Sequence, residues 1–324
     1  MSRTEMGMRG VAVPLDLAWL GHNSGKLIPH ISVCVCSYRR PRFLRRLLNK
    51  LNEQETEGLF TYSIVISDND PDRSGAAVVA RMSPASKVPI RYCVEPRRNI
   101  ALARNRAVEH AEGAFIALID DDEFPEPTWL LTLYQTLCEY RVDGVLGGVR
   151  RHFEEVPPPW FKKSGIYSRR VNPTGTVVQW KESRTGNALL KRGMFACDTM
   201  PFRPEFRAGE DQDFFRRKIE AGYRFIWSAD ALVSETITPA RWRRSYILRK
   251  AMLQGATAAL QPNCTKLNIA KSVIAVPFYL LVLPFAFLLG QQYFMRLMIK
   301  ICDHSGKLLM SVGINPIREE YVSE

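Results

Sequence analysis

The 324-residue sequence predicts an α/β protein with an open, mostly parallel sheet, helices on both faces, and an apolar helical segment near the C-terminus that associates with a membrane. Three observations predict this class. Short apolar runs rich in β-forming residues alternate with helical segments, which is typical of a parallel sheet covered on both faces. Acidic or polar groups directly follow three of these runs. Residues 273–295 contain no charged side chain.

The expected strands are short apolar runs, at residues 31–36, 62–67, 90–94, 115–119 and 185–190. Helices are expected at 41–51, 99–111, 129–140 and 210–221. The first begins at Pro41, a residue favoured in the first turn, and places five apolar side chains on one face: Phe43, Leu44, Leu47, Leu48 and Leu51. Gly113 and Gly222 are expected to stop the second and fourth helices. The remainder of 150–200 shows little pattern.

The carboxyl ends of the strands are where such sheets bind ligands. The groups that follow Cys36, Ser67 and Ile119 are therefore expected to meet at one edge of the sheet.

The composition restricts the function further. Lysine and arginine total 45 against 33 acidic residues, and the net charge of +12 favours an anionic partner. The seven cysteines form no C-x-x-C pair, which argues against zinc ribbons and thioredoxin-like sites. Neither G-x-G-x-x-G nor G-x-x-x-x-G-K-S/T occurs, so the phosphate cradles of dinucleotide-binding and P-loop proteins are missing.

Three consecutive aspartates, Asp120, Asp121 and Asp122, end the fourth expected strand. Packed carboxylates repel one another, so a cation must neutralise them or one must stay protonated. Mg²⁺ or Mn²⁺ takes one or two carboxylates plus substrate phosphates, and would bridge Asp122, with Asp120, to a diphosphate leaving group. The alternative is an acidic loop beside Pro125. The position at the end of a buried strand favours the metal site.

Glu210 and Asp211 belong to a second acidic cluster, at the start of the helix expected at 210–221. Acidic residues in a first helical turn are favoured by the helix dipole, and this structural interpretation suffices on the residues alone. The functional alternative is that Asp211 is a general base for a hydroxyl acceptor. Basic residues at 97–106 either meet phosphate groups or cover a solvated helix face. Those at 241–250 bind a pyrophosphate-bearing acceptor or an anionic membrane surface, or else cover a solvated helix face.

The order of these motifs resembles that of family 2 glycosyltransferases, inverting enzymes of the Rossmann-like GT-A fold that use nucleotide-sugar donors. The resemblance is carried by residues 31–41, 68, 103–105, 113–122, 186–187 and 209–211. Residues 119–125 with Trp129 and Leu130, and 233–235 followed by Arg241, are typical of bacterial exopolysaccharide glycosyltransferases of the succinoglycan type. The likeness covers residues 30–255 well.

The resemblance implies roles for individual residues. Those that would bind the donor are Ser37, Tyr38, Arg39, Asp68, Arg104, Asp120, Asp121 and Asn187. Asp68 would contact the base, Asp120 and Asp121 would lie near the ribose and metal, and Asn187 near the sugar. Asp122 would be the principal ligand of Mn²⁺ or Mg²⁺, with Asp120. Glu210 and Asp211 match the family's E-D motif, whose second acid is the catalytic base.

The resemblance also implies partners and a location. The donor would be a UDP-sugar, and the acceptor a lipid-linked oligosaccharide or polysaccharide hydroxyl at the cytoplasmic face of the bacterial inner membrane; no nucleic-acid partner is expected. Two departures stand out. The Q-x-x-R-W motif is missing, which favours one sugar per acceptor, and Glu235 stands where many relatives place a metal-contacting histidine.

Two rival functions come from other classes. A Mg²⁺-dependent phosphohydrolase would use the aspartates, but its usual D-x-D-x-T/V pattern is broken by Phe124. A basic nucleic-acid-binding protein is suggested by charge alone, and no nucleic-acid motif supports it.

The chain is expected to divide into four parts: an N-terminal extension at 1–28, a catalytic domain at 29–240, a basic amphipathic region at 241–270 and a membrane-associated region at 271–324. The uncharged segment 273–295 is long enough to cross a bilayer as a helix. Pro277 and Pro284 argue against a straight helix, and basic residues flank both ends. We therefore expect a bent, re-entrant or interfacial hairpin that does not cross; a kinked span or a buried helix pair are the alternatives.

Overall fold

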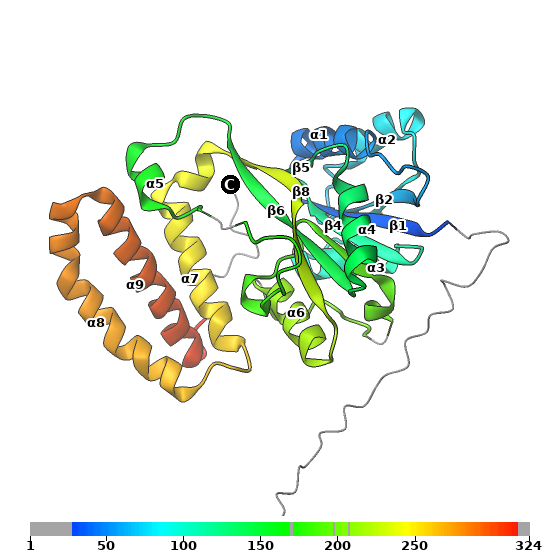
Figure 1. Cartoon of the computed structure of the whole chain (residues 1–324). Helices are drawn as coiled ribbons and strands as arrows, with labels where there is room; N and C mark the ends of the chain where they lie inside the picture. Colours follow the sequence, from blue (N-terminus) through cyan, green and yellow to red (C-terminus); the bar gives the residue numbers. More distant parts are fainter. Residues whose placement is uncertain (1–27, 169–170, 197, 207, 317–324) are drawn as a thin grey trace, which may run out of the picture.

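The computed structural model describes residues 28–168, 171–196, 198–206 and 208–316. Its centre is an eight-stranded sheet in the order β3-β2-β1-β4-β7-β6-β8-β5 (Figure 1). The strands are β1 His30–Ser37, β2 Thr61–Asp68, β3 Ile90–Val94, β4 Phe115–Asp120, β5 Glu123–Pro125, β6 Gly144–Phe153, β7 Ala188–Lys191 and β8 Phe225–Ile237. The predicted N-terminal extension lies outside the described residues, except for Ile28.

The first half of the sheet is parallel. β1 pairs with both β2 and β4, and β2 pairs with β3. These are the first four expected strands, and each prediction is confirmed to within one residue at either end. Their apolar runs are nearly continuous because helices cover both faces of this part of the sheet.

The second half makes the sheet mixed. β7 is antiparallel to both β4 and β6, β5 is antiparallel to β8, and β6 and β8 are parallel. The strand expected from residue 185 begins only at Ala188, because Asn187 has a φ of 75°, outside the extended region. β6 and β8 were not predicted, since glycines and charged residues interrupt their apolar pattern.

Two apolar cores lie on opposite faces of the sheet. Alternate residues of β1 separate between them: Ile31, Val33 and Val35 pack with α1 and α4, whereas Cys34 packs with α3 and α6. The helices are α1 Pro41–Leu51, α2 Ala76–Met82, α3 Ile100–Glu109, α4 Trp129–Tyr140, α5 Pro159–Ser164, α6 Glu210–Glu220, α7 Arg244–Leu260, α8 Lys266–Leu289 and α9 Gln291–Ser311. The prediction of helices on both faces is therefore confirmed.

The start of α3 is fixed by its cap. The Asn99 side chain accepts hydrogen bonds from the backbone N–H groups of Ala101 and Leu102. The expected stop at Gly113 is wrong, because α3 already ends at Glu109. Gly113 serves a different contact: its φ is 86°, and any side chain there would overlap the His30 backbone.

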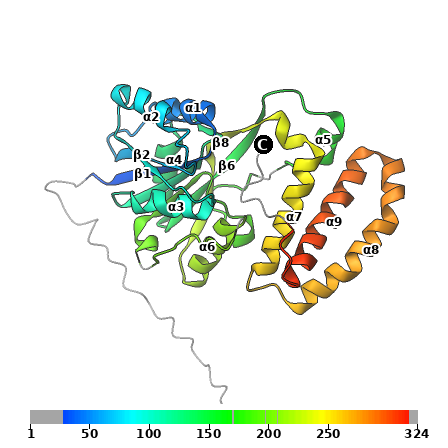
Figure 2. The same ribbon diagram turned by 180° about the vertical axis from the view of Figure 1, so that it is seen from behind.

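The C-terminal helices form a separate layer beside the sheet. α9 packs between α7 and α8, and the three lie side by side in both views (Figures 1 and 2). Two glycines allow α7 and α9 to approach closely. A side chain at Gly255 would overlap the carbonyl oxygen of Asp303, and one at Gly306 would overlap that of Met252.

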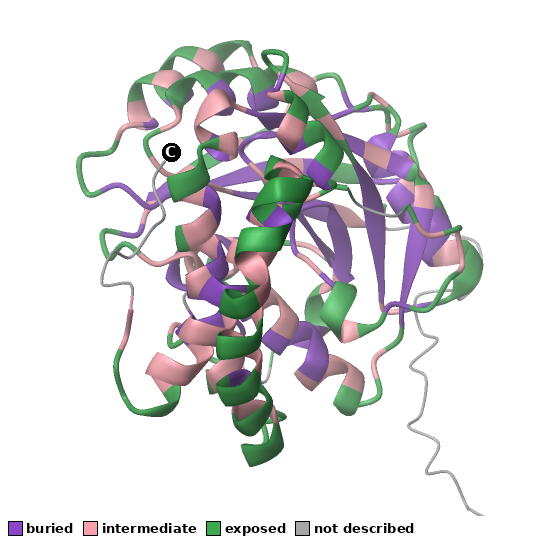
Figure 3. Cartoon of the chain, turned by 90° about the vertical axis from the view of Figure 1, so that its left-hand side faces the viewer, coloured by how far each residue is buried: buried purple, intermediate pink, exposed green. Residues whose placement is uncertain are grey.

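α8 is the outermost helix and is largely exposed (Figure 3). Among the described residues it is the one helix that is long and apolar enough to cross a membrane, with a mean hydropathy of 2.4. This exposure decides against a buried helix pair. The expected bend does lie inside 273–295, because the chain reverses at Gly290 between α8 and α9. The prolines do not cause it: Pro277 and Pro284 lie within one continuous helix. A proline deletes only one ladder hydrogen bond, which a long helix can absorb.

Candidate active site

The expected cluster at the carboxyl ends of the strands is confirmed. In the sheet register Ser37 of β1 lies opposite Asp68 of β2, and Cys36 lies opposite Asp120 of β4. The three consecutive aspartates therefore leave the sheet beside the loop that follows β1.

Asp121 lies deepest of the three. Its carboxylate accepts a 2.9 Å hydrogen bond from the Ser37 hydroxyl and forms a 3.1 Å ion pair with Arg40. Burial raises the pKa of Asp121 to about 6, because Arg40 compensates only in part and Asp122 adds repulsion. Ser37 thus contacts one of the three aspartates directly.

Asp122 is held by two arginines. Arg40 pairs with it at 3.1 Å, and Arg241 pairs with its Oδ2. Arg241 also binds Glu235 at 2.7 Å, and the second oxygen of Glu235 pairs with Arg151. The side chains of this network are mostly buried, so its charges attract strongly.

Sequence reasoning missed this network. The charge pattern places Arg241 on a solvated helix face, at an anionic membrane surface or at a pyrophosphate-bearing acceptor, yet its side chain is buried in a short 3₁₀ helix, Pro239–Trp242, that precedes α7. This burial rules out the solvated face for Arg241. Nothing local in the sequence pairs Glu235 with Arg151, which lies on another strand.

Arg104 joins the two acidic clusters. It extends from α3, is buried, and pairs with Asp120 of β4 at 3.2 Å and with Glu210 of α6. The solvated-face interpretation is therefore wrong for Arg104. The Asp120 side chain keeps 43% of its surface exposed, so it faces the open side of the edge. One guanidinium thus fixes the distance between the aspartate strand and the predicted catalytic helix.

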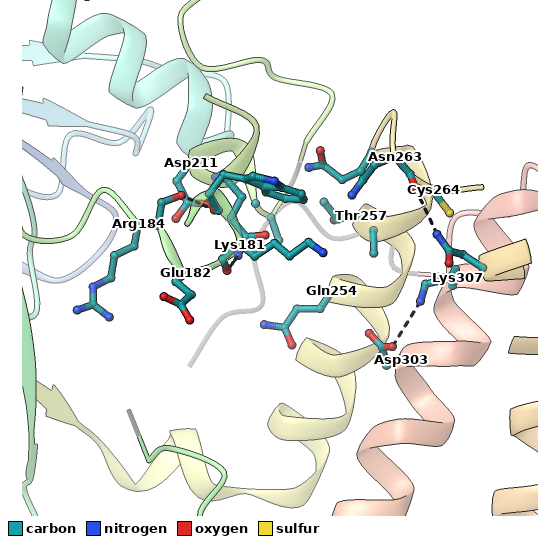
Figure 4. A pocket seen from close by; sticks show the side chains of 18 of the residues that line it. Lys181, Glu182, Arg184, Asp211, Gln254, Thr257, Asn263, Cys264, Asp303 and Lys307 are labelled. Carbon is teal, nitrogen blue, oxygen red and sulfur yellow. Dashed lines mark hydrogen bonds and ion pairs between the residues drawn. The ribbon is translucent and has the colours of Figure 1, made fainter. Parts of the chain in front are cut away.

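Glu210 and Asp211 have different surroundings. Glu210 is buried against Arg104, and burial raises its pKa to about 7, with further repulsion from Asp211. Burial also raises the pKa of Asp211, and Arg104 opposes the shift. Asp211 lines a pocket of about 830 Å³ between the sheet edge and the C-terminal helices (Figure 4). A carboxylate with a raised pKa beside a cavity has the attributes of a general base.

Two of the predicted donor-binding residues have structural partners. Asp68 is fully buried and accepts hydrogen bonds from the backbone N–H groups of Asp70 and Gly75 and from the Tyr92 hydroxyl. Asn187 is also fully buried. Its amide donates to the carbonyl oxygens of Gly148 and Ala231, and its oxygen accepts from Trp129 Nε1 at 2.7 Å. These contacts support the loop and the strand end and leave neither side chain facing open space.

Tyr38 and Arg39 lie at the outer rim. The Tyr38 ring is half-buried and faces the guanidinium groups of Arg39 and Arg98. Arg39 has a positive φ of 54° and pairs with Asp70 at 3.2 Å and Asp72 at 2.8 Å. An aromatic ring flanked by cations suits a flat, electron-rich group carrying phosphates.

The carboxylates at the carboxyl ends of the strands fit a divalent cation that also binds substrate. The described residues contain no group of three or more metal-type side chains, so the protein alone offers no closed cage. The network nevertheless holds more carboxylates than arginines: Asp120, Asp121, Asp122, Glu210, Asp211 and Glu235 outnumber its four guanidinium groups. The remaining negative charge suits an ion held by one or two carboxylates and by phosphate oxygens.

Comparison with known proteins identifies the family. The model for glycosyl transferase family 2 matches residues 32–200. The succinoglycan biosynthesis protein ExoM of Rhizobium meliloti is 32% identical, over 70% of this chain and 74% of that protein. The glycosyltransferase AglE of Haloferax volcanii is 24% identical, over 63% of this chain and 66% of that protein.

Two solved structures share the fold. The mannosyltransferase PcManGT from Pyrobaculum calidifontis, in complex with GDP-Man and Mn²⁺, aligns with a TM-score of 0.59 at 18% identity, over 91% of this chain and 92% of that chain. S. aureus TarS 1–349 in complex with UDP aligns with a TM-score of 0.50 at 15% identity, over 88% of this chain and 92% of that chain. The expectation of a GT-A-type fold is thereby confirmed, and the phosphohydrolase and nucleic-acid alternatives are set aside. The chain belongs to glycosyl transferase family 2 and is a glycosyltransferase.

Proposed function

We propose that this glycosyltransferase is an inverting enzyme that moves one sugar from a nucleotide-sugar donor, a UDP-sugar, to a hydroxyl of a lipid-linked or polysaccharide acceptor in exopolysaccharide or cell-surface glycan synthesis. The observation that carries the proposal is the position of Asp211, which lines a large pocket and is joined to the aspartate strand through Arg104 and Glu210. The name of the R. meliloti relative supports the exopolysaccharide role.

The chain's own residues supply the proton transfer. Asp211 accepts the proton of the acceptor hydroxyl while the acceptor oxygen bonds to the anomeric carbon and the bond from that carbon to the donor phosphate breaks. Attack from the face opposite the leaving group inverts the configuration, and one base suffices for one step. The raised pKa of Asp211 makes it a better proton acceptor than an exposed aspartate.

The edge of the sheet at the carboxyl ends of β1, β2 and β4, which we call the donor edge, would hold the nucleotide and a divalent cation. Tyr38 and Arg39 would border the nucleotide, and Asp120 and Asp121 would lie near the ribose. Mn²⁺ or Mg²⁺, held by Asp122 and Asp120, would neutralise charge on the departing diphosphate. Asp68 and Asn187 would act indirectly, by shaping the loop after β2 and the start of β7, because their polar atoms are occupied.

The features of α8 and its flanks support a proposal for the membrane side. Its exposed apolar surface suits a bilayer, and Lys266, Lys271, Arg296, Lys300 and Lys307 lie on α8 and α9 around it. Basic residues on both flanks favour the cytoplasmic face, where anionic lipids and nucleotide sugars are found. We propose that α8 and α9 anchor the enzyme to the cytoplasmic face of the bacterial inner membrane without a full crossing.

A donor screen tests the function. The full-length protein in detergent is incubated with UDP-glucose, UDP-galactose, UDP-N-acetylglucosamine and GDP-mannose, with Mn²⁺, Mg²⁺ or EDTA, and nucleotide release is measured. We expect release from one UDP-sugar, with metal only, and a product of inverted anomeric configuration by NMR. Release from GDP-mannose alone would correct the donor. A lack of release from any nucleotide sugar would contradict the proposal.

A further inference from the structure

The pocket beside Asp211 extends well beyond the catalytic base. Its walls are the short 3₁₀ helix Trp180–Glu182, the start of α6, one side of α7, and the facing ends of α8 and α9. Figure 4 shows Asp211 on one side of the space and Lys307 and Asp303 on the other, with Gln254 and Thr257 of α7 between them. The catalytic base and the helical layer therefore share one cavity of a volume that suits a small ligand.

Two buried polar atoms in the wall have no partner. Gln261 at the end of α7 is 8% exposed, and its Oε1 accepts no hydrogen bond from any described residue. Trp227 of β8 is 4% exposed, and its Nε1 donates to no described residue. Both side chains line the pocket. Because buried polar groups are normally satisfied, this acceptor and this donor each call for a partner in the wall, which a water or a hydroxyl group of a ligand would supply.

The far wall carries two lysines. Lys307 of α9 lines the pocket, is 16% exposed, and reaches Asp303 only at 3.9 Å, a weak pair. Lys271 of α8 lines the same wall, and no ion pair of this residue occurs within the described part of the chain. Lys271 is exposed and lies less than one helical turn before the uncharged segment 273–295. Both lysines therefore line the cavity near the end of α8 at which its uncharged segment begins.

We infer that this pocket is the acceptor site, and that Lys271 and Lys307 bind a phosphate or diphosphate group that links the acceptor glycan to its lipid. The inference rests on the proposed function and names the residues that would recognise the acceptor. Gln261 and Trp227 bond to sugar hydroxyls, Asp211 receives the proton of the reacting hydroxyl, and the lipid leaves the pocket along α8. Bilayer headgroups offer the same phosphate chemistry, but Lys307 lines the wall that faces Asp211.

The test compares two double variants that remove equal charge from the same helices. Lys271→Gln with Lys307→Gln changes the pocket, whereas Lys266→Gln with Lys300→Gln changes α8 and α9 outside it. Binding of farnesyl diphosphate and of farnesol to the full-length protein is measured by tryptophan fluorescence, in EDTA to suppress binding at the aspartates. We expect the pocket pair to weaken farnesyl diphosphate binding at least about tenfold and the control pair less than about twofold.

The same variants separate the two sources of phosphate. Each pair removes two charges, so cosedimentation with phosphatidylglycerol vesicles should fall equally for both. The inference is overturned if the two pairs weaken farnesyl diphosphate binding equally, if neither does, if farnesol binding falls to the same extent, or if the pocket pair loses vesicle binding alone.

Measuring nucleotide-sugar hydrolysis distinguishes a failure of this inference from a failure of the proposed function. The control pair Lys266→Gln with Lys300→Gln should retain wild-type hydrolysis in the donor screen, because neither lysine lines the pocket or the edge of the sheet that carries the aspartates. If the wild type hydrolyses no nucleotide sugar but binds farnesyl diphosphate through Lys271 and Lys307, the proposed function fails and the anion site stands.

Gln261→Leu tests the sugar contacts: acceptor KM should rise while the Tm does not fall, because an orphan buried carbonyl is removed. A lowered Tm with unchanged KM would count against them.

Discussion

Arg104 offers the most informative perturbation of the site. Its guanidinium is 8% exposed and pairs with Glu210, whose side chain is 6% exposed, and with the half-exposed Asp120. Replacing Arg104 by Met keeps the length and apolar stem of the side chain but leaves Glu210 buried without its counter-charge. Breaking a buried pair from one side costs about 3–5 kcal/mol when the stranded charge persists. Glu210 can instead take up a proton, so we expect a loss of unfolding free energy of about 3 kcal/mol at pH 8.5: about 1 kcal/mol of hydrogen bonding, and at most about 2 kcal/mol for the interval above the pKa of about 7.

The pH dependence of this loss follows from Glu210. Burial raises its pKa to about 7 in the folded protein, from an ordinary value of 4.5. Ionising Glu210 therefore opposes folding: its contribution is most favourable below pH 4.5 and worsens as the pH rises to about 7. Without Arg104 the folded-state pKa rises further. Wild type and variant then carry the same neutral Glu210 at pH 6, where only about 1 kcal/mol of lost hydrogen bonding remains, and diverge above pH 7.

Urea unfolding at pH 6 and pH 8.5, followed by tryptophan fluorescence on the full-length protein in detergent, measures the effect. The double variant Arg104→Met with Glu210→Gln is the control, since it removes the stranded charge and should recover most of the stability at pH 8.5. An equal deficit at the two pH values, or no deficit at pH 8.5, would refute the reasoning.

Three further expectations concern the metal, the base and the membrane. Asp122→Asn should weaken Mn²⁺-dependent UDP binding about tenfold or more in calorimetry, since one anionic ligand is lost; unchanged affinity would remove Asp122 from the metal site. Asp211→Asn should lower transfer by about 10²–10⁴-fold with donor affinity intact, whereas Glu182→Gln, in the same pocket, should change it less than about threefold; wild-type transfer by the Asp211 variant would exclude it as the base. Leu281→Lys with Leu288→Lys, at positions 73% and 82% exposed, should reduce vesicle binding without lowering the Tm; undiminished binding would show that α8 is not the anchor.

The sequence alone determined the parallel half of the sheet and the order of the acidic motifs. Apolar runs of a few residues with polar groups at their ends are local patterns, and they located β1 to β4 to within one residue. The same patterns placed Asp120 at the edge of the sheet and the acidic pair of Glu210 and Asp211 at the start of a helix. Whether an apolar run is buried depends mainly on its own residues, so it can be predicted without knowledge of the tertiary structure.

Only the tertiary structure decided which partner each charge receives. Arg241 meets Asp122, and Arg104 meets Glu210, although each pair lies more than a hundred residues apart in the chain. Burial of Asp68 and Asn187, and the cavity that joins Asp211 to Lys307, likewise depend on elements from distant segments. An ion pair or a pocket wall requires two surfaces at a defined separation. That separation depends on strand order and helix packing, which involve the whole chain and are not encoded in any short segment.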